Sequence, residues 1–388
     1  MPLNAGAGPR RTRILIVDDS AVMRSLLRTV VAKDPSLEVA GAAADGQSAL
    51  DAIDSLRPDL VLLDVEMPVM DGLVTLKKLR AKSHRMPVIM CSSLTQRGAK
   101  VTIDALAGGA SDYVAKPHNQ SGRDAAMEAL FRDLVPKIHA LCPPPRAATP
   151  SSASAPPRAS GVFPSASVQP ALLQPLPSTQ PTVLAVAVST GGPSVLDLVL
   201  PALPSSFPLP ILIVQHMPEV FTRLLAVRLN GRCRIPVREA AEGEPVRSGV
   251  IYIARGGYHL EAIAGIRAGT KPTLHLTQGP LENHCRPAAD VLFRSVANVY
   301  GAGVLALVLT GMGSDGLAGC RVIRDVGGGV LVQDQASSAV WGMPGAVANA
   351  GLAHKILPLA KIAPEIIRLA GCKPSEPSQL RESMVMEC

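Results

Sequence analysis

The stretch 183–192 reads Val-Leu-Ala-Val-Ala-Val-Ser-Thr-Gly-Gly. An unbroken run of small and branched apolar residues that ends in a glycine turn is typical of a strand buried on both faces. Two later stretches contain a similar apolar run: 211–216, Ile-Leu-Ile-Val-Gln-His, and 304–311, Val-Leu-Ala-Leu-Val-Leu-Thr-Gly. Helical patterns lie between them, and this alternation predicts a parallel sheet covered by helices. Further strands of the same block are expected at 250–253, 273–276 and 329–332.

Each of the three runs is followed by a polar residue of a different kind, namely Ser189, His216 and Asp315. The carboxyl ends of parallel strands share one edge of a sheet, so these residues could meet as nucleophile, base and orienting carboxylate. The order Ser-His-Asp and the lack of a Gly-x-Ser-x-Gly turn argue against the common α/β-hydrolase fold. Spacing alone leaves alternatives open. Asp315 could simply cap a helix, and the rival bases are His259, His275, His284 and His354.

The turn after the serine has features that suit an anionic oxygen. Gly191 and Gly192 let the backbone come close to a substrate, and a helical pattern begins at residue 194. Amides at the start of a helix favour an anion. The segment Gly311-Met312-Gly313 could offer a second backbone donor from the other side. The alternative is that Thr190-Gly191-Gly192-Pro193 is an ordinary turn.

A separate alternation of strands and helices fills the first 141 residues, again typical of a parallel α/β sheet. Strands are expected at 13–17, 60–63, 87–90 and 112–114. Functional loops of such sheets lie beyond the carboxyl ends of the strands. The residues at that edge are Asp18, Asp19, Asp64, Ser92 and Lys116.

These five residues point to a phosphoryl acceptor. Carboxylates held together repel one another, and Mg²⁺, which prefers oxygen ligands, relieves that repulsion. Asp64 could then attack phosphorus as a carboxylate nucleophile, while Ser92 and Lys116 hold the phosphoryl oxygens. Taken singly, each has a plainer explanation: Asp19 with Ser20 could cap the next helix, and Lys116 with Pro117 could form a turn.

Composition bounds the remaining possibilities. The formal charge of +7 comes from scattered basic residues, without a basic stripe that would indicate nucleic-acid binding. No apolar stretch has the length of a membrane helix, and the N-terminus lacks the apolar core of a signal peptide. The seven cysteines form no C-x-x-C pair, which disfavours a disulfide framework or a zinc site and fits a reducing cytoplasm.

Two segments lack the pattern of a folded domain. Residues 142–181 contain 11 Pro and 7 Ser and no acidic residue, so they cannot bury a core and are expected to form a linker. Such a segment could instead be a proline-rich docking site. Residues 373–388 show little periodicity and are expected to be a disordered tail.

The first block resembles the receiver domain of two-component response regulators over about residues 12–135. The resemblance implies a flavodoxin-like fold, and a histidine kinase that phosphorylates Asp64. It further implies that Asp18, Asp19 and Asp64 bind Mg²⁺, that Lys116 supports the phosphoryl group, and that Ser92 and Tyr113 report phosphorylation to the surface. The matching stretches are 16–20 (Ile-Val-Asp-Asp-Ser), 63–72 (Leu-Asp-Val-Glu-Met-Pro-Val-Met-Asp-Gly), 91–93 (Cys-Ser-Ser) and 113–117 (Tyr-Val-Ala-Lys-Pro).

The second block, 182–371, resembles the catalytic domain of the chemotaxis protein-glutamate methylesterases. The matching stretches include 188–192 (Val-Ser-Thr-Gly-Gly), 215–218 (Gln-His-Met-Pro), 290–296 (Asp-Val-Leu-Phe-Arg-Ser-Val), 309–316 (Leu-Thr-Gly-Met-Gly-Ser-Asp-Gly) and 341–344 (Trp-Gly-Met-Pro). The whole chain then reads as two doubly wound parallel-sheet domains joined by the Pro/Ser-rich linker.

The resemblance implies a phosphorylation-activated hydrolase of sensory adaptation, which removes methyl esters from glutamates of methyl-accepting chemoreceptors and releases methanol. Some members also deamidate glutamines. It implies Ser189, His216 and Asp315 as the triad, with Thr190 and Met312 at site-lining and oxyanion positions and no organic cofactor. The expected partners are a histidine kinase and the receptors' cytoplasmic helices, with no nucleic acid and no membrane insertion, in the cytoplasm.

The sequence departs from the family pattern where Arg255 replaces a common Pro, Cys285 a common His and Ala288 a common Ser. These departures leave substrate contacts open but remove no triad residue. Two other functions remain at this point: a phosphorylation-regulated binding module with an inactive triad, or a methylesterase of a pathway other than motility.

Overall fold

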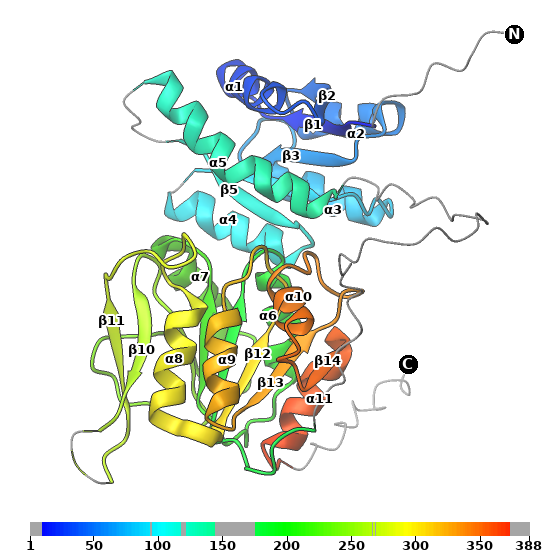
Figure 1. Ribbon diagram of the computed structural model, residues 1–388. Coiled ribbons are helices and arrows are strands. Elements are labelled where there is room, and N and C mark those ends of the chain that lie inside the picture. Colours follow the sequence, from blue (N-terminus) through cyan, green and yellow to red (C-terminus); the bar gives the residue numbers. More distant parts are fainter. Residues whose placement is uncertain are drawn as a thin grey trace, which may run out of the picture. The chain divides into compact units, whose positions relative to one another are not determined.

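The structure is a computed structural model that describes residues 10–93, 95–117, 122–143, 175–265, 267 and 269–372. The expected tail at 373–388 and most of the expected linker, 144–174, lie outside these residues. The described residues form two compact units, and each is built on its own parallel sheet (Figure 1). The predicted fold class is therefore confirmed.

The first sheet contains five parallel strands in the order β2-β1-β3-β4-β5, which is the flavodoxin-like order. The strand order reverses between β1 and β3, so the loops after these two strands flank the switch point. The elements are β1 (Thr12–Val17), α1 (Ala21–Ala32), β2 (Leu37–Ala43), α2 (Gly46–Leu56), β3 (Leu60–Asp64), α3 (Gly72–Ala81), β4 (Val88–Ser92), α4 (Gln96–Ala107), β5 (Asp112–Ala115) and α5 (Arg123–Leu141).

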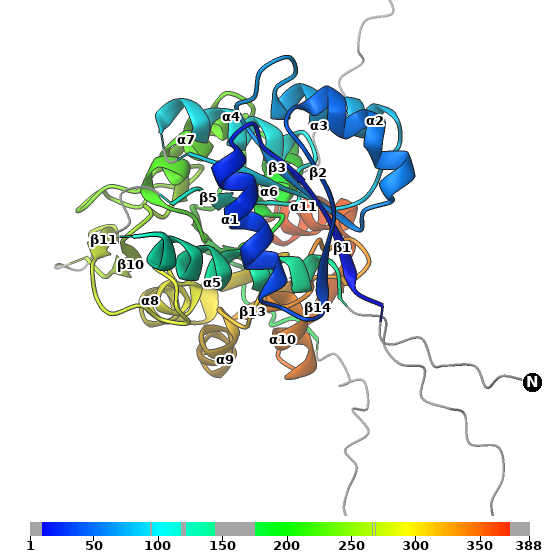
Figure 2. The same cartoon turned by 90° about the horizontal axis from the view of Figure 1, so that it is seen from above.

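One face of this sheet packs against α1 and α5, which lie side by side in Figure 2. Apolar residues recur along α1 at helical spacing, and Met23, Leu27 and Val30 are buried there against the strands. Leu130 and Leu134 of α5 complete the same core. This packing fixes the strands, and with them the positions of the polar residues at their carboxyl ends.

The second sheet contains seven parallel strands in the order β14-β13-β12-β6-β7-β9-β8. Its strands are β6 (Val183–Val188), β7 (Ile211–Gln215), β8 (Val237–Glu239), β9 (Ile251–Ile253), β12 (Val304–Val308), β13 (Gly329–Gln333) and β14 (Lys355–Leu357). The chain runs from β6 to β7 on one side and later reaches β12 on the other. The switch point of this sheet therefore lies between β6 and β12, where ligands bind in open α/β sheets.

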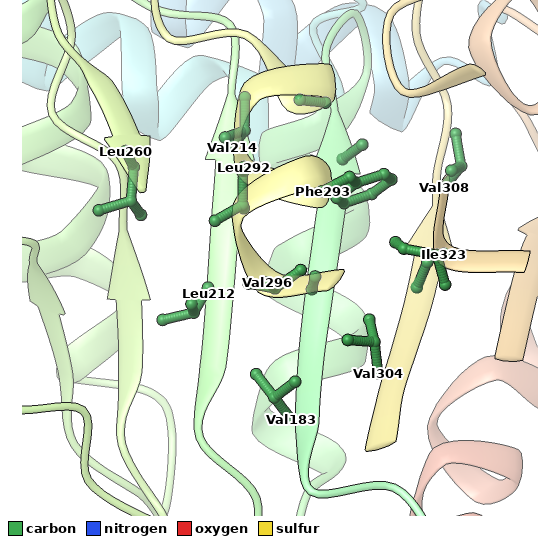
Figure 3. Packing of buried hydrophobic residues seen from close by; sticks show 14 of the residues in the cluster. Val183, Leu212, Val214, Leu260, Leu292, Phe293, Val296, Val304, Val308 and Ile323 are labelled. Carbon is green, nitrogen blue, oxygen red and sulfur yellow. The ribbon is translucent and has the colours of Figure 1, made fainter. Parts of the chain in front are cut away.

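Helices cover this sheet, and α8 is the clearest case. Figure 3 shows its residues Leu292, Phe293 and Val296 lying against Val183, Val214 and Val304 of the central strands. Small strand residues such as Ala185 and Ala187 leave room for the large side chains of α8. The helices are α6 (Gly192–Val199), α7 (Glu219–Asn230), α8 (Ala289–Tyr300), α9 (Leu317–Asp325), α10 (Met343–Asn349) and α11 (Leu359–Leu369), with short 3₁₀ turns at Leu200–Ala202 and Gly301–Gly303.

One predicted strand lies outside the parallel sheet. The stretch predicted at 273–276 forms β11 (Thr273–Thr277), which pairs antiparallel with β10 (His259–Ile263) as a two-stranded hairpin. Leu260 and Leu274 of the hairpin are buried against the main core, but Glu261 and Ile263 are not. In the part of the chain that the structure describes, no helix combines the length and the apolar character needed to cross a bilayer.

Candidate phosphoryl-acceptor and hydrolase sites

Three carboxylates meet at the switch point of the first sheet. Asp18 follows β1 and is fully buried, Asp64 ends β3 and is almost fully buried, and Asp19 is exposed. One oxygen from each of them lies within 4.8 Å of the others. The Lys116 ammonium, at the end of β5, lies 2.8 Å from Asp18 Oδ2 and 2.7 Å from Asp64 Oδ2. Four of the five residues predicted at this edge are thus in one cluster.

The charge of this cluster fits a divalent cation. One ammonium faces three carboxylates, and two of these are shielded from water. Burial, aided by the charge of Asp18, raises the pKa of Asp64 to about 6 despite the opposing effect of Lys116. A hard cation bound by the three carboxylates would relieve this repulsion, since such ions take oxygen ligands. The donor set therefore suits Mg²⁺.

The residues around the cluster are placed by neighbouring strands. Ser92 is fully buried on β4, one residue beyond Cys91, which is the register partner of Asp64. Its hydroxyl donates to Ser93 O at 3.1 Å. Tyr113 is buried on β5, and the Lys137 ammonium lies 5.1 Å from the centre of its ring. The alternative that Asp19 with Ser20 caps the next helix holds for Ser20, which is the N-cap of α1 and whose hydroxyl accepts from Met23 N.

The register of the second sheet brings the ends of β6, β7 and β12 together. Val188 is the partner of Gln215, so Ser189 and His216 each lie one residue beyond that pair. The amide of Ser189 donates to Thr310 O at 3.0 Å, which joins the loop after β6 to the second residue beyond β12. Parallel pairing thus accounts for the convergence of segments distant in the sequence.

A His–Asp pair is formed at this edge. His216 Nε2 lies 2.7 Å from Asp315 Oδ2, and both side chains are largely or wholly buried. Asp315 also accepts from the first amides of α8, those of Ala289 at 2.6 Å and Asp290 at 3.0 Å. A carboxylate at a helix N-terminus is stabilised by these amides and by the helix dipole.

His216 and Asp315 shift each other's pKa in opposite directions. Burial lowers the pKa of His216, but the hydrogen bonds and charges of Asp315 and Cys285 outweigh burial and raise it above its ordinary value. Burial raises the pKa of Asp315, yet the bonds from His216 and the α8 amides hold it below its ordinary value. The arrangement therefore favours an imidazolium facing a carboxylate, which is the charge distribution that develops when a histidine takes a proton.

Ser189 lies level with His216 in the strand register, but its hydroxyl is not hydrogen-bonded to that histidine. The Ser189 hydroxyl makes no hydrogen bond within the described residues, whereas its carbonyl accepts from Gly192 N at 2.8 Å and from Gln215 Nε2 at 3.0 Å. Catalytic hydrogen bonds are often long before a substrate binds. Of the glycines predicted to line the site, Gly191 adopts φ +78° immediately before α6. Met312, which follows Gly311 in the sequence, has a partly exposed side chain.

The rival histidines have other partners. His259 Nε2 lies 2.8 Å from Pro280 O, His275 Nδ1 lies 2.9 Å from Glu242, and His354 Nε2 lies 2.7 Å from Arg324. His284 is exposed at a positive φ of 62°. Within the described residues, His216 is the histidine that pairs with Asp315.

Two further residues of this site are not among the predicted site residues. Gln215 is 2% exposed and reaches from β7 to the carbonyl of Ser189. Asn283 Nδ2 donates to both Asp315 Oδ1 and Asp290 Oδ2, at 2.9 Å each. The amide at the end of an apolar run signals Gln215, but the loop that carries Asn283 has no pattern to read.

The three departures from the family pattern lie near the site in different ways. Cys285 helps to raise the pKa of His216, Arg255 pairs with Glu219 and covers the ring of Tyr258, and the amide of Ala288 donates to His259 Nδ1 at 3.2 Å. None of them displaces Ser189, His216 or Asp315.

Two protein-family models match separate parts of this chain. Residues 14–127 match the family model of the response regulator receiver domain, and residues 184–366 match that of the CheB methylesterase. A protein-glutamate methylesterase/protein-glutamine glutaminase of Trichodesmium erythraeum is 49% identical, with 92% of this chain and 99% of that protein covered. One of the same name from Nocardioides sp. is 48% identical, with 94% and 97% covered.

Among solved structures, the CheB methylesterase catalytic domain of Thermotoga maritima is 39% identical, with a TM-score of 0.47, and the match covers 49% of this chain and 100% of that domain. The identity over nearly the whole length of the two curated relatives decides the family. The chain belongs to the protein-glutamate methylesterase/protein-glutamine glutaminase family.

Proposed function

We propose that this protein hydrolyses glutamate methyl esters on chemotaxis receptors, releasing methanol, and that phosphorylation of Asp64 raises the rate. The observation that carries the proposal is the His216–Asp315 pair beside Ser189 at the switch point of the second sheet. The phosphoryl-acceptor cluster in the same chain supplies the means of regulation. Relatives that this chain matches over nearly their whole length bear the names of both activities, methylesterase and glutaminase.

The geometry supports a serine-hydrolase mechanism. His216 takes the proton of Ser189 Oγ as the oxygen attacks the ester carbonyl carbon, and then gives that proton to the departing methanol. Water releases the acyl group as glutamate by the reverse use of the same residues. Asp315 stabilises the imidazolium in both steps. A glutamine side chain would follow the same course, with ammonia as the leaving group.

The transient negative oxygen needs backbone donors. The amides of Gly191 and Met312 donate to no group in the described part of the chain, so both remain available to a substrate oxygen. By contrast, the amide of Gly192 is taken by Ser189 O and that of Gly311 by Val340 O. Of the predicted site-lining residues, Gly191 and Met312 therefore suit the oxyanion role, with Thr190 between the nucleophile and the first of them.

In the receiver unit, Asp64 accepts the phosphoryl group from a histidine kinase. Asp18, Asp19 and Asp64 would hold Mg²⁺, which supplies positive charge for the phosphoryl oxygens. Lys116 pairs with that group once Asp64 is modified, and Ser92 and Tyr113 on the adjacent strands respond to it. A histidine kinase as phosphodonor and receptor signalling helices as substrate would both place this protein in the cytoplasm.

The test is methanol release from a chemoreceptor cytoplasmic fragment with radiolabelled glutamate methyl esters, with and without acetyl phosphate as phosphodonor. The wild type should release methanol, and more of it with the donor. Ser189→Ala should abolish release while Asp64 is still phosphorylated. Normal turnover by this variant would overturn the triad assignment, and phosphorylation of the wild type without any methanol would overturn the enzymatic function.

A further inference from the structure

The two available amides share a structural feature. Each belongs to a peptide unit whose carbonyl, on the opposite side, is held by other groups of the protein. Thr190 O accepts from the Thr310 hydroxyl at 2.9 Å. Gly311 O accepts from Gly342 N at 3.0 Å and Met343 N at 2.9 Å.

Planarity of the peptide links the two sides. In a trans peptide the carbonyl of one residue and the amide of the next point in opposite directions within one plane. A group that fixes Thr190 O therefore fixes the direction of the Gly191 N–H. The same holds for Gly311 O and the Met312 N–H. The donors for the oxyanion are thus set in direction before any substrate arrives, which is the condition for effective electrostatic stabilisation.

Thr310 supplies the side chain that holds the carbonyl of Thr190. It is fully buried two residues beyond β12, and its backbone is fixed on both sides, by Gln333 Oε1 at its amide (2.9 Å) and by Ser189 N at its carbonyl (3.0 Å). Its hydroxyl accepts from Val340 N at 3.0 Å. A hydroxyl has one proton to donate, and the nearer acceptor is Thr190 O at 2.9 Å. The other, Val340 O at 3.2 Å, already receives the amide of Gly311.

We propose that Thr310 is a positioning residue for catalysis: its hydroxyl holds the carbonyl of Thr190 and so aims the amide of Gly191 at the oxyanion of the reaction. This inference rests on the proposed function. It assigns the hydroxyl a role in the chemical step and none in binding the substrate in its ground state. Removal of the hydroxyl should therefore lower kcat and leave KM unchanged.

The experiment compares Thr310→Val, which keeps the branched shape but loses the hydroxyl, with Thr310→Ser, which keeps it. Both are made in the full chain and phosphorylated with acetyl phosphate. Methanol release from the methylated receptor fragment gives kcat and KM. The rate at which a fluorophosphonate labels Ser189 gives a second reading, because its P=O oxygen occupies the oxyanion position whatever the natural substrate is.

Thr310→Val should lose kcat by about 10- to 100-fold, less than the roughly 10²–10³-fold for loss of a whole donor. Labelling of Ser189 should slow by a similar factor, and Thr310→Ser should stay near the wild type. Thr182→Val serves as the control, because it makes the same change at the opposite end of β6, where the hydroxyl contacts Gly303 O.

Wild-type kcat and labelling in Thr310→Val would overturn the inference. Equal losses in Thr310→Ser and Thr310→Val, accompanied by equal falls in Tm, would overturn it as well, because a hydroxyl-dependent role predicts rescue by serine. A wild type that is labelled but releases no methanol would overturn the proposed function alone, and the labelling rates would still test Thr310. A wild type that does neither would overturn both.

Discussion

At the scale of single residues, the site depends on the charge state of His216. The imidazole must be neutral to accept the proton of Ser189, and its partners raise its pKa above the ordinary value. Activity should therefore be lost as pH falls through that raised pKa, and kcat/KM should still be rising above neutral pH. The measurement is the pH profile of kcat/KM for methanol release.

Asp315→Asn separates this pKa effect from a general loss of activity. The substitution removes the charge that stabilises the imidazolium, so the pKa of His216 should fall and the rising limb of the profile should move to lower pH. The maximum should also fall steeply, because the orienting carboxylate is lost. An unshifted limb in this variant would show that another group titrates.

Gly72 shows how close packing places the phosphoryl acceptor. A Cβ at this position would lie 2.0 Å from the carbonyl oxygen of Asp64, too close for any side chain without movement of the strand end. Gly72→Ala should therefore displace Asp64 and lower the rate of phosphorylation by acetyl phosphate. Gly231→Ala is the matched control, because its Cβ would meet only ordinary contacts, the nearest at 3.5 Å. Equal phosphorylation of both variants would contradict the packing argument.

At the scale of elements, an ion-pair cluster ties the edge strand β14 to α11. Glu365 on α11 accepts from Lys355 Nζ of β14 at 2.8 Å and from Arg368 Nη2 at 2.7 Å. Its hydrogen bond with Arg368, aided by Lys355, lowers the pKa of Glu365 to about 2. A carboxyl with a depressed pKa in the folded state stabilises the fold at pH values above its unfolded pKa, and that contribution is lost as pH falls toward 2.

Glu365→Gln should accordingly lower the free energy of unfolding by about 1–3 kcal/mol near pH 7, and the difference from the wild type should shrink below pH 4. Urea unfolding followed by fluorescence can measure it, because Trp341, the single tryptophan of the chain, lies in the same unit. Glu219→Gln breaks the exposed pair with Arg255 and should cost less than about 1 kcal/mol. A pH-independent difference for Glu365→Gln would exclude the ion-pair explanation.

The elements predicted from sequence are those with long apolar runs. The central strands β6, β7 and β12 are buried throughout, so their patterns stand out and their ends place Ser189, His216 and Asp315. Edge strands carry no such pattern: β2 is mostly half-exposed, and β14 has only three residues. Asn283 could not be foreseen, because its contact with Asp315 depends on how the loop after β11 folds back.

Oxyanion positioning was equally hidden from the sequence. In the sequence, Thr310 is only the polar residue that follows an apolar run. The pairing of β12 with β6 brings its hydroxyl to Thr190 O. Register between parallel strands is a non-local property, set by the packing of whole faces. Motifs can therefore name candidate residues, whereas the contacts that orient them come from the assembled sheet.

At the scale of the whole molecule, the chain couples a phosphoryl acceptor to a hydrolase. For such coupling, phosphorylation of Asp64 must change the free energy of the catalytically competent state. A coupling free energy of about 1–3 kcal/mol corresponds to a change in activity of roughly 5- to 150-fold. Acetyl phosphate should thus raise methanol release by the full chain within that range.

Asp64→Asn isolates the regulatory step, since its amide cannot form the acyl phosphate while the size of the side chain is kept. This variant should show the basal rate of the unphosphorylated wild type and no response to the phosphodonor, with Ser189 still present and active. Deletion of residues 1–141 tests the direction of the coupling. If the receiver restrains the catalytic domain, the truncated protein should exceed the basal rate without any donor, whereas a rate at or below basal would mean that the receiver activates rather than restrains.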